Sequence, residues 1–164
     1  MGGLVPHRVL AGEWWRVVAA NFLHYGWLHL ITNMIGLYFI GRYFESRFGR
    51  INFLAIYVLS GIVSMALFTL LSIYFTQKEQ VLVGASAAIM GLIGAIFSLS
   101  VKKFIFFKSR ESLFRVQAVS SIIIFQLFID YFHPNISLMS HFLGLSIGFM
   151  ALSFYSFMMN KYEL

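Results

Sequence analysis

The chain has 164 residues, of which 60% are hydrophobic and only 11% are charged. A soluble domain of this length needs more charge to cover its surface, whereas a bilayer core requires about 20 apolar residues for each helical span. The sequence holds several such runs, separated by short charged clusters. It therefore predicts an all-α protein, a polytopic transmembrane helical bundle in one domain, and argues against the alternating pattern of a membrane β-barrel.

The net charge and the absence of cysteine narrow the range of possible functions further. There are no cysteines, which excludes disulfides, thiolate nucleophiles and Cys-ligated metals. The net charge of +6 does not indicate nucleic-acid binding, because the cations gather in short loops, as they do in membrane proteins. We expect the lipid bilayer as a partner and no nucleic acid.

The first 26 residues do not resemble a membrane span. Glycines and Pro6 interrupt them, and the segment Glu13-Trp14-Trp15-Arg16 joins charge to two tryptophans, a combination that suits the lipid headgroup region. Residues 1–26 are therefore expected to form an interfacial loop. The apolar runs that follow predict five spans, at about 27–44, 51–75, 81–101, 116–132 and 137–158.

The distribution of basic residues predicts the orientation. On one side lie Arg8, Arg16 and Lys78. The segments after the first, third and fifth spans hold the remaining cations, which are Arg42, Arg47, Arg50, Lys102, Lys103, Lys108, Arg110, Arg115 and Lys161. Basic residues favour the cytoplasmic side. The N-terminus is therefore expected outside and the C-terminus in the cytoplasm, in a bacterial inner or plasma membrane.

This topology brings three polar side chains to similar depth on the outer side. Ser86 lies in the outer part of the third span, His141 lies about one turn into the fifth, and His29 lies near the outer end of the first. A serine becomes a nucleophile when a base can take its proton. A lone serine beside glycine and alanine is usually a packing residue, but a histidine at matched depth makes Ser86 a candidate nucleophile and His141 its candidate base.

Small residues on the two helices would allow close approach. At 100° per residue, His141, Gly144 and Gly148 fall within roughly 60° of one another. Small residues also lie near Ser86 on its own helix, namely Ala87, Gly91 and Gly94. Small faces let membrane helices pack closely, which a direct Ser–His hydrogen bond would require. Ordinary helix packing, with the two polar residues as incidental neighbours, stays open as the alternative.

The remaining polar groups suggest an oxyanion site. His29 and Asn33 are four residues apart and share one helix face, so both are candidate oxyanion donors together with the backbone N–H of Ser86. A hydrogen-bonding pair between helices is the structural alternative. No acidic residue is obviously placed to orient His141. Asp130 is expected to lie solvated at the outer interface, so the sequence predicts a Ser–His dyad without a third member.

Several motifs, in order along the chain, resemble the rhomboid family of intramembrane serine proteases. They are Trp15-Arg16, His29-x-x-x-Asn33, Glu45-x-Arg47, Gly84-Ala85-Ser86 and His141-x-x-Gly144-x-x-x-Gly148. The resemblance implies a rhomboid-like bundle that cleaves transmembrane protein substrates through an acyl-enzyme, without metal or cofactor. It also implies that Gly84 lets the backbone bend near the substrate, and it leaves the oligomeric state open.

The chain departs from the family pattern in three respects. Ala87 stands where the family usually has glycine, and Met90 stands where it often has an aromatic residue. The five expected spans match the second to sixth helices of the family core, so we expect the first helix to be missing.

Two other functions stay open. The first is a non-catalytic rhomboid-like protein that binds membrane clients. The second is a small transporter or channel that uses His24, His29 and His141 as a proton path. A metal site on His29 and His141 is a weaker idea, since no third ligand is evident at that depth.

Overall fold

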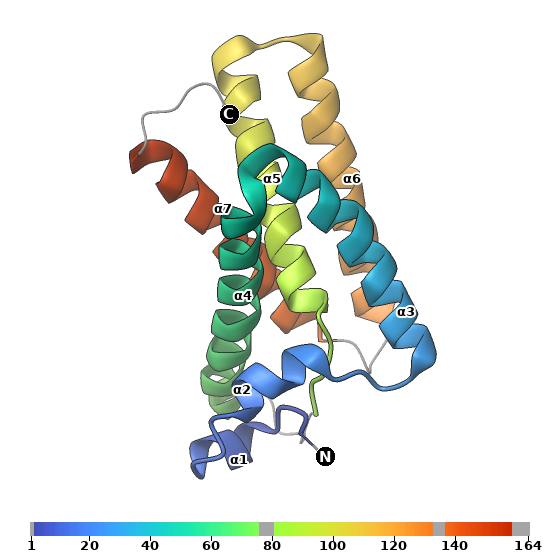
Figure 1. Cartoon of the computed structure of the whole chain (residues 1–164), viewed down its shortest axis with the longest axis vertical. Helices are drawn as coiled ribbons and strands as arrows, with labels where there is room; N and C mark the ends of the chain where they lie inside the picture. Colours follow the sequence, from blue (N-terminus) through green and yellow to red (C-terminus); the bar gives the residue numbers. More distant parts are fainter. Residues whose placement is uncertain (1, 76–80, 133–136, 159–164) are drawn as a thin grey trace.

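Almost all of the described chain is helical. The computed structural model describes residues 2–75, 81–132 and 137–158, arranged as a bundle of long helices with short helices at one end (Figure 1). The elements in chain order are α1 (Pro6–Leu10), α2 (Arg16–Ala19), η1 (Ala20–Phe22), α3 (Trp27–Gly36), η2 (Leu37–Gly41), α4 (Arg42–Phe75), α5 (Ser86–Phe107), α6 (Arg110–Phe132) and α7 (Leu138–Met158).

The described helices include the stretches that a polytopic membrane protein requires. Those long and apolar enough to cross a bilayer are Trp27–Tyr74, Ser86–Phe107, Arg110–Phe132 and Leu138–Met158. The first of these contains two of the expected spans, because Gly49 interrupts it with a backbone φ of 80° and ψ of 163°. A positive φ is a conformation that glycine adopts at little cost. The ribbon accordingly reverses direction near the start of α4 (Figure 1), and the prediction of a polytopic helical bundle is confirmed.

Two helix boundaries differ from the approximate limits of the expected spans. The third span was expected from residue 81, but α5 begins at Ser86, and the preceding residues pair with the N-terminal segment through mutual backbone hydrogen bonds of 2.9 Å between Leu4 and Leu82. The fourth span was expected from residue 116, but α6 begins at Arg110. Hydropathy alone does not distinguish an extended apolar segment from a helical one. It also does not show that a helix extends beyond its apolar part into charged residues.

The N-terminal segment is more structured than the interfacial loop predicted for 1–26. It contains three short helices and contributes to a buried cluster with α4 and the segment before α5, formed by Leu4, Val17, Ala20, Met65, Phe68 and Leu82. Arg16 is only 4% exposed; its Nη1 donates to the carbonyl oxygen of Gly3 at 2.8 Å, and its Nε donates to Glu13 at 2.5 Å. Burial of a charge is tolerated because it is paired and hydrogen-bonded. The segment is thereby fastened to the end of the bundle where α5 and α7 begin (Figure 1).

Helix α5 is central and packs directly against α7. A Cβ atom added to Gly144 would overlap the carbonyl of Ala87, and one added to Gly148 would overlap the carbonyl of Gly91. Conversely, a Cβ on Gly94 would overlap the carbonyl of Leu145 on α7. The small residues on the two helices thus bring the backbones of α5 and α7 into contact. Helix α6 is peripheral, since only 11% of its most apolar 18-residue stretch is buried.

This contact gives a test of the packing. We expect Gly148→Ala to destabilise the folded protein by about 2 kcal/mol, because a rigid backbone carbonyl occupies the space that the methyl group needs. Gly36→Ala is the matched control, since its Cβ would meet Ile89 at an ordinary 3.8 Å. Thermal unfolding in detergent would measure both variants. Equal stability of the two would contradict the close α5–α7 contact.

Candidate active site

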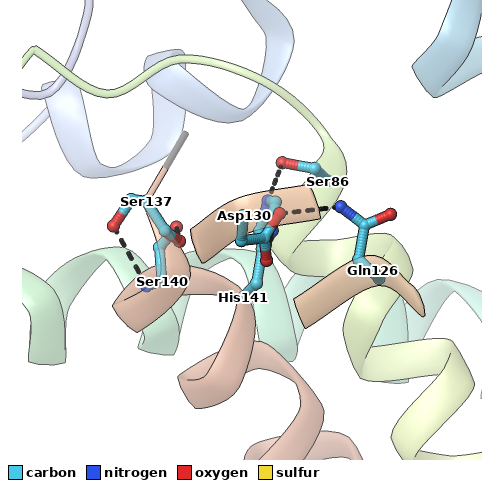
Figure 2. A network of polar contacts seen from close by, with 6 residues as sticks. All are labelled: Ser86, Gln126, Asp130, Ser137, Ser140 and His141. Carbon is cyan, nitrogen blue, oxygen red and sulfur yellow. Dashed lines mark hydrogen bonds and ion pairs between the residues drawn. The ribbon is translucent and has the colours of Figure 1, made fainter. Parts of the chain in front are cut away.

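Ser86 and His141 meet where α5 and α7 begin. The Oγ of Ser86 lies 2.6 Å from the Nε2 of His141, within hydrogen-bond distance (Figure 2). His141 is only 3% exposed, whereas Ser86 is half-buried. The close approach of the helices at Ala87 and Gly144 explains why two short side chains can span the gap. A buried imidazole on a partly accessible hydroxyl is the arrangement that can remove a proton from serine.

The other ring nitrogen of His141 has a carboxylate partner. Its Nδ1 lies 2.7 Å from Oδ2 of Asp130, and Asp130 is 3% exposed. Asp130 was expected to be solvated at the outer interface, and His141 was expected to have no carboxylate partner. The structure shows that Asp130 is buried and contacts His141, so both expectations were wrong. The last turn of α6 meets the first turn of α7, so a residue near a predicted span end is enclosed by the neighbouring helix (Figure 2).

Asp130 is itself held in place. The Nε2 of Gln126, one turn earlier on α6, donates to Oδ1 of Asp130 at 2.8 Å. Both carboxylate oxygens thus accept a hydrogen bond, as a buried carboxylate requires. When Nδ1 of His141 carries the proton and donates it to Asp130, the free lone pair of Nε2 faces Ser86. The sequence signal for this pair was the i, i+4 spacing of two polar residues on one face of an otherwise apolar helix.

The start of α7 is fixed by local hydrogen bonds. The hydroxyl of Ser137 accepts from the backbone N–H of Ser140 at 3.2 Å, and the carbonyl of Ser137 accepts from the N–H of His141 at 3.2 Å (Figure 2). A serine in this position caps a helix N-terminus. The cap holds the first turn of α7, and with it His141, in a set position.

His29 lies beside the serine, at the place where Gly84 comes close. A Cβ on Gly84 would come within 2.8 Å of both Cε1 and Nε2 of His29 and within 3.6 Å of the Ser86 hydroxyl. Gly84 also has a φ of 125°, which disfavours any other residue. The imidazole of His29 packs edge-on against His24, with ring centroids 5.1 Å apart. Burial lowers the pKa of His24.

Asn33 is buried on the same helix, and its side chain is hydrogen-bonded to the backbone of α3. It is 6% exposed, and its Nδ2 donates to the carbonyl oxygen of His29 at 2.8 Å. The amide nitrogen of Asn33 carries two protons, and this hydrogen bond within α3 uses one of them. The second proton is available for another acceptor. Ser86, as the first residue of α5, has a backbone N–H without an intrahelical acceptor. His29 and this N–H thus lie beside the Ser86 hydroxyl or next to it in the chain.

The residues that depart from the expected pattern are accommodated in the core. Ala87 is fully buried, and Met90 is 2% exposed. Met90 belongs to a buried cluster with Ala85, Ile93 and Ile123, which joins α5 to α6. Among the described residues, no group of three or more His, Asp or Glu side chains is arranged to hold a metal ion.

Comparison with known proteins identifies the family. The Rhomboid domain family model matches residues 11–158, which is most of the chain. The protein belongs to the rhomboid family. The match includes all four long helical stretches and the residues around Ser86 and His141.

Individual relatives agree with this assignment. The chain is 34% identical to RHOMBOID-like protein 5 of Arabidopsis thaliana, over 91% of this chain and 46% of that protein. It is 31% identical to the rhomboid protease GluP of Bacillus subtilis, over 87% of this chain and 26% of that protein. It is also 35% identical to the inactive RHOMBOID-like protein 8 of Arabidopsis thaliana, over 80% of this chain and 38% of that protein. The chain thus spans less than half the length of these relatives, and the family includes proteins named proteases and a protein named inactive.

Proposed function

We propose that this rhomboid is a serine endopeptidase that cleaves transmembrane-helix substrates, with Ser86 as nucleophile and His141 as general base. The observation that carries the proposal is the 2.6 Å contact between Ser86 Oγ and the buried His141 Nε2. If Ser86 and His141 were only incidental neighbours, there would be no reason for the second nitrogen of the same imidazole to face a buried carboxylate, as it does at Asp130. The three groups together support nucleophilic catalysis more strongly than the serine–histidine contact alone.

The reaction would proceed in two stages. Ser86 Oγ attacks the scissile carbonyl carbon while His141 Nε2 takes the hydroxyl proton. The tetrahedral intermediate then collapses; the C–N bond breaks, the leaving amine takes the proton from Nε2, and an ester to Ser86 remains. Water attacks this ester with His141 again as base, which releases the carboxylic acid and restores the serine.

His29 and the Ser86 backbone N–H would stabilise the negative oxygen of the intermediate, with Asn33 as a further donor once its side chain reorients. Preorganised donors of this kind contribute on the order of 10²–10³ in rate each. Asp130 would act on the reaction through His141: it accepts the Nδ1 proton and stabilises the imidazolium that forms.

The cleavage chemistry would lie toward the outer side of the membrane. The starts of α5 and α7 share one end of the bundle with α1 and α2, and the basic segments near 42–50 and 102–115 lie at the other end (Figure 1). Basic ends favour the cytoplasm. This supports an N-terminus outside and a C-terminus inside, in the plasma membrane or bacterial inner membrane.

The proposal is tested by labelling with a fluorophosphonate probe in detergent, which requires no known substrate. We expect the wild type to be labelled at Ser86, because only a serine with an adjacent base reacts readily. Ser86→Ala should remove the label completely. The matched control is Ser98→Ala, since Ser98 is a buried serine on the same helix that is hydrogen-bonded to Ser153 at 2.7 Å.

Two results would contradict the proposal. One is equal labelling of wild type and Ser86→Ala. The other is an unlabelled wild type whose thermal unfolding shows that it is folded. The second result would favour a non-catalytic protein that binds membrane clients, an alternative that the similarity to the inactive RHOMBOID-like protein 8 keeps open.

A further inference from the structure

An apolar groove lies at the end of the bundle opposite Ser86. It has a volume of about 200 Å³ and lies between η2, α4, α5 and α6. Its lining side chains are Ile40, Tyr43, Ile93, Ile96, Ser100, Phe114, Arg115, Ala118, Val119 and Ile122. Most of them are aliphatic or aromatic, and Phe114 is 70% exposed. The groove therefore borders the lipid-facing surface of α6 and is not enclosed within the core.

One end of this groove continues into a basic hollow. The hollow is lined by Arg47, Lys103 and Arg115 together with residues such as Phe48 and Leu99. The two spaces are neighbours, since Tyr43, Ile96, Ser100 and Arg115 line both. The hollow itself is small, at about 10 Å³, so its importance is that it places the cationic side chains of Arg47, Lys103 and Arg115 beside the apolar groove.

The charge at this end of the bundle is strongly positive. Of the residues that the structure describes there, the carboxylates Glu45 and Glu111 are paired with Arg50 and Arg115 respectively. The guanidinium of Arg47 instead lies 5.6 Å from the centre of the Tyr43 ring, at the mouth of the groove. The other cations nearby are Arg42, Lys102, Lys103, Lys108 and Arg110. Among the described residues, cations thus outnumber carboxylates at this end, which favours an anion at the mouth.

We propose that this groove binds an anionic phospholipid of the surrounding bilayer. The phosphate would lie between Arg47 and Lys103, where charge-assisted hydrogen bonds to phosphate oxygens are strong. An acyl chain segment would extend along Ile96, Ala118 and Ile122. Basic pockets between transmembrane helices bind anionic headgroups. The adjoining apolar groove favours a lipid over a soluble anion, because a free phosphate would leave that groove without a partner.

The groove is separate from the catalytic residues. On α5 the lining begins at Ile93, seven positions after Ser86 or roughly 10 Å along the helix axis, and it ends at Ser100, fourteen positions or roughly 21 Å away. The lipid site therefore does not depend on the proposed protease activity. Substitutions in it are expected to leave fluorophosphonate labelling at Ser86 unchanged, which makes labelling a check that the variants are folded.

The test is native mass spectrometry of the full chain in detergent with added phosphatidylglycerol or phosphatidylcholine. We expect the wild type to bind phosphatidylglycerol in preference. The double variant Arg47→Gln/Lys103→Gln should bind it roughly 30-fold more weakly, since each cation near a membrane surface contributes about a factor of five. The matched control, Arg42→Gln/Lys108→Gln, removes the same charge from the same end but outside the groove, and should change affinity less than about threefold.

A charge-neutral variant tests the apolar part. Ala118→Phe fills the groove and should also weaken phosphatidylglycerol binding, while excess inorganic phosphate should not displace the lipid. Equal losses in the two double variants would overturn the proposal, because the attraction would then be general to this end of the bundle. Unchanged binding in Ala118→Phe, or displacement by inorganic phosphate, would overturn it in favour of a soluble-anion site.

Discussion

Ser86→Ala and His141→Ala are each expected to lower the rate of cleavage of a transmembrane substrate by a factor on the order of 10⁶. A nucleophile and its base act as one unit, so the loss of either removes nearly all of the covalent pathway. The 2.6 Å contact between Ser86 Oγ and His141 Nε2 is the structural basis for this unit. Cleavage of a single-span substrate in liposomes, followed by mass spectrometry of the products, measures the rate.

The double variant distinguishes a shared role from two separate roles. If Ser86 and His141 act together, Ser86→Ala/His141→Ala should be no slower than either single variant. Ser98→Ala is again the control, and it should retain activity because Ser98 pairs with Ser153 away from the site. Retention of a tenth or more of the wild-type rate in Ser86→Ala would remove Ser86 from the mechanism.

The sequence was sufficient to predict the polar groups that meet at the start of α5 and α7. Span boundaries and alternating basic segments placed Ser86 and His141 at one depth, and glycines at helical spacing predicted the close contact. These signals are periodic or compositional, so they are visible without coordinates. The structure places the two side chains within hydrogen-bond distance, as that contact requires.

Asp130 was not predicted as a partner of His141, for a physical reason. A carboxylate near the end of an apolar run is normally solvated, and hydropathy does not indicate that the next helix folds back over it. The extended conformation of the segment 81–85 was not predicted for a related reason. Val81, Leu82 and Val83 are apolar enough for a span, yet Leu82 pairs with Leu4, and Gly84 has a positive φ that a helix does not contain. Both errors concern contacts between segments far apart in the sequence.

The basic hollow beside the apolar groove could not be predicted from the sequence either. The sequence located Arg47, Lys103 and Arg115 in the segments expected to be cytoplasmic, where they indicated the topology and, for Arg47, a family motif. Their gathering around one hollow depends on α4, α5 and α6 presenting them to a common space. A residue that reports topology in the sequence can therefore also form part of a specific site, and only the packing of three helices distinguishes the two roles.

Asp130→Asn is expected to lower kcat by on the order of 10³–10⁴ while KM changes little. The carboxylate accepts the Nδ1 proton of His141, which leaves Nε2 unprotonated toward Ser86. An asparagine can instead donate its amide proton to Nδ1, and the proton of the neutral imidazole then moves to Nε2, where it prevents the ring from accepting the serine proton. The loss thus comes from the wrong tautomer and not from a misfolded site.

Two comparisons separate this effect from a purely structural one. Asp130→Ala removes the acceptor without supplying a donor, so it should be less damaging than Asp130→Asn even though it loses more packing. Nitrogen NMR of labelled histidine in detergent should report the Nδ1–H tautomer of His141 in the wild type and the Nε2–H tautomer in Asp130→Asn. Equal kcat in wild type and Asp130→Asn would mean that α7 packing alone orients His141. An alanine variant slower than the asparagine variant would mean that Asp130 serves the fold of α6 against α7 and not the protonation state of the base.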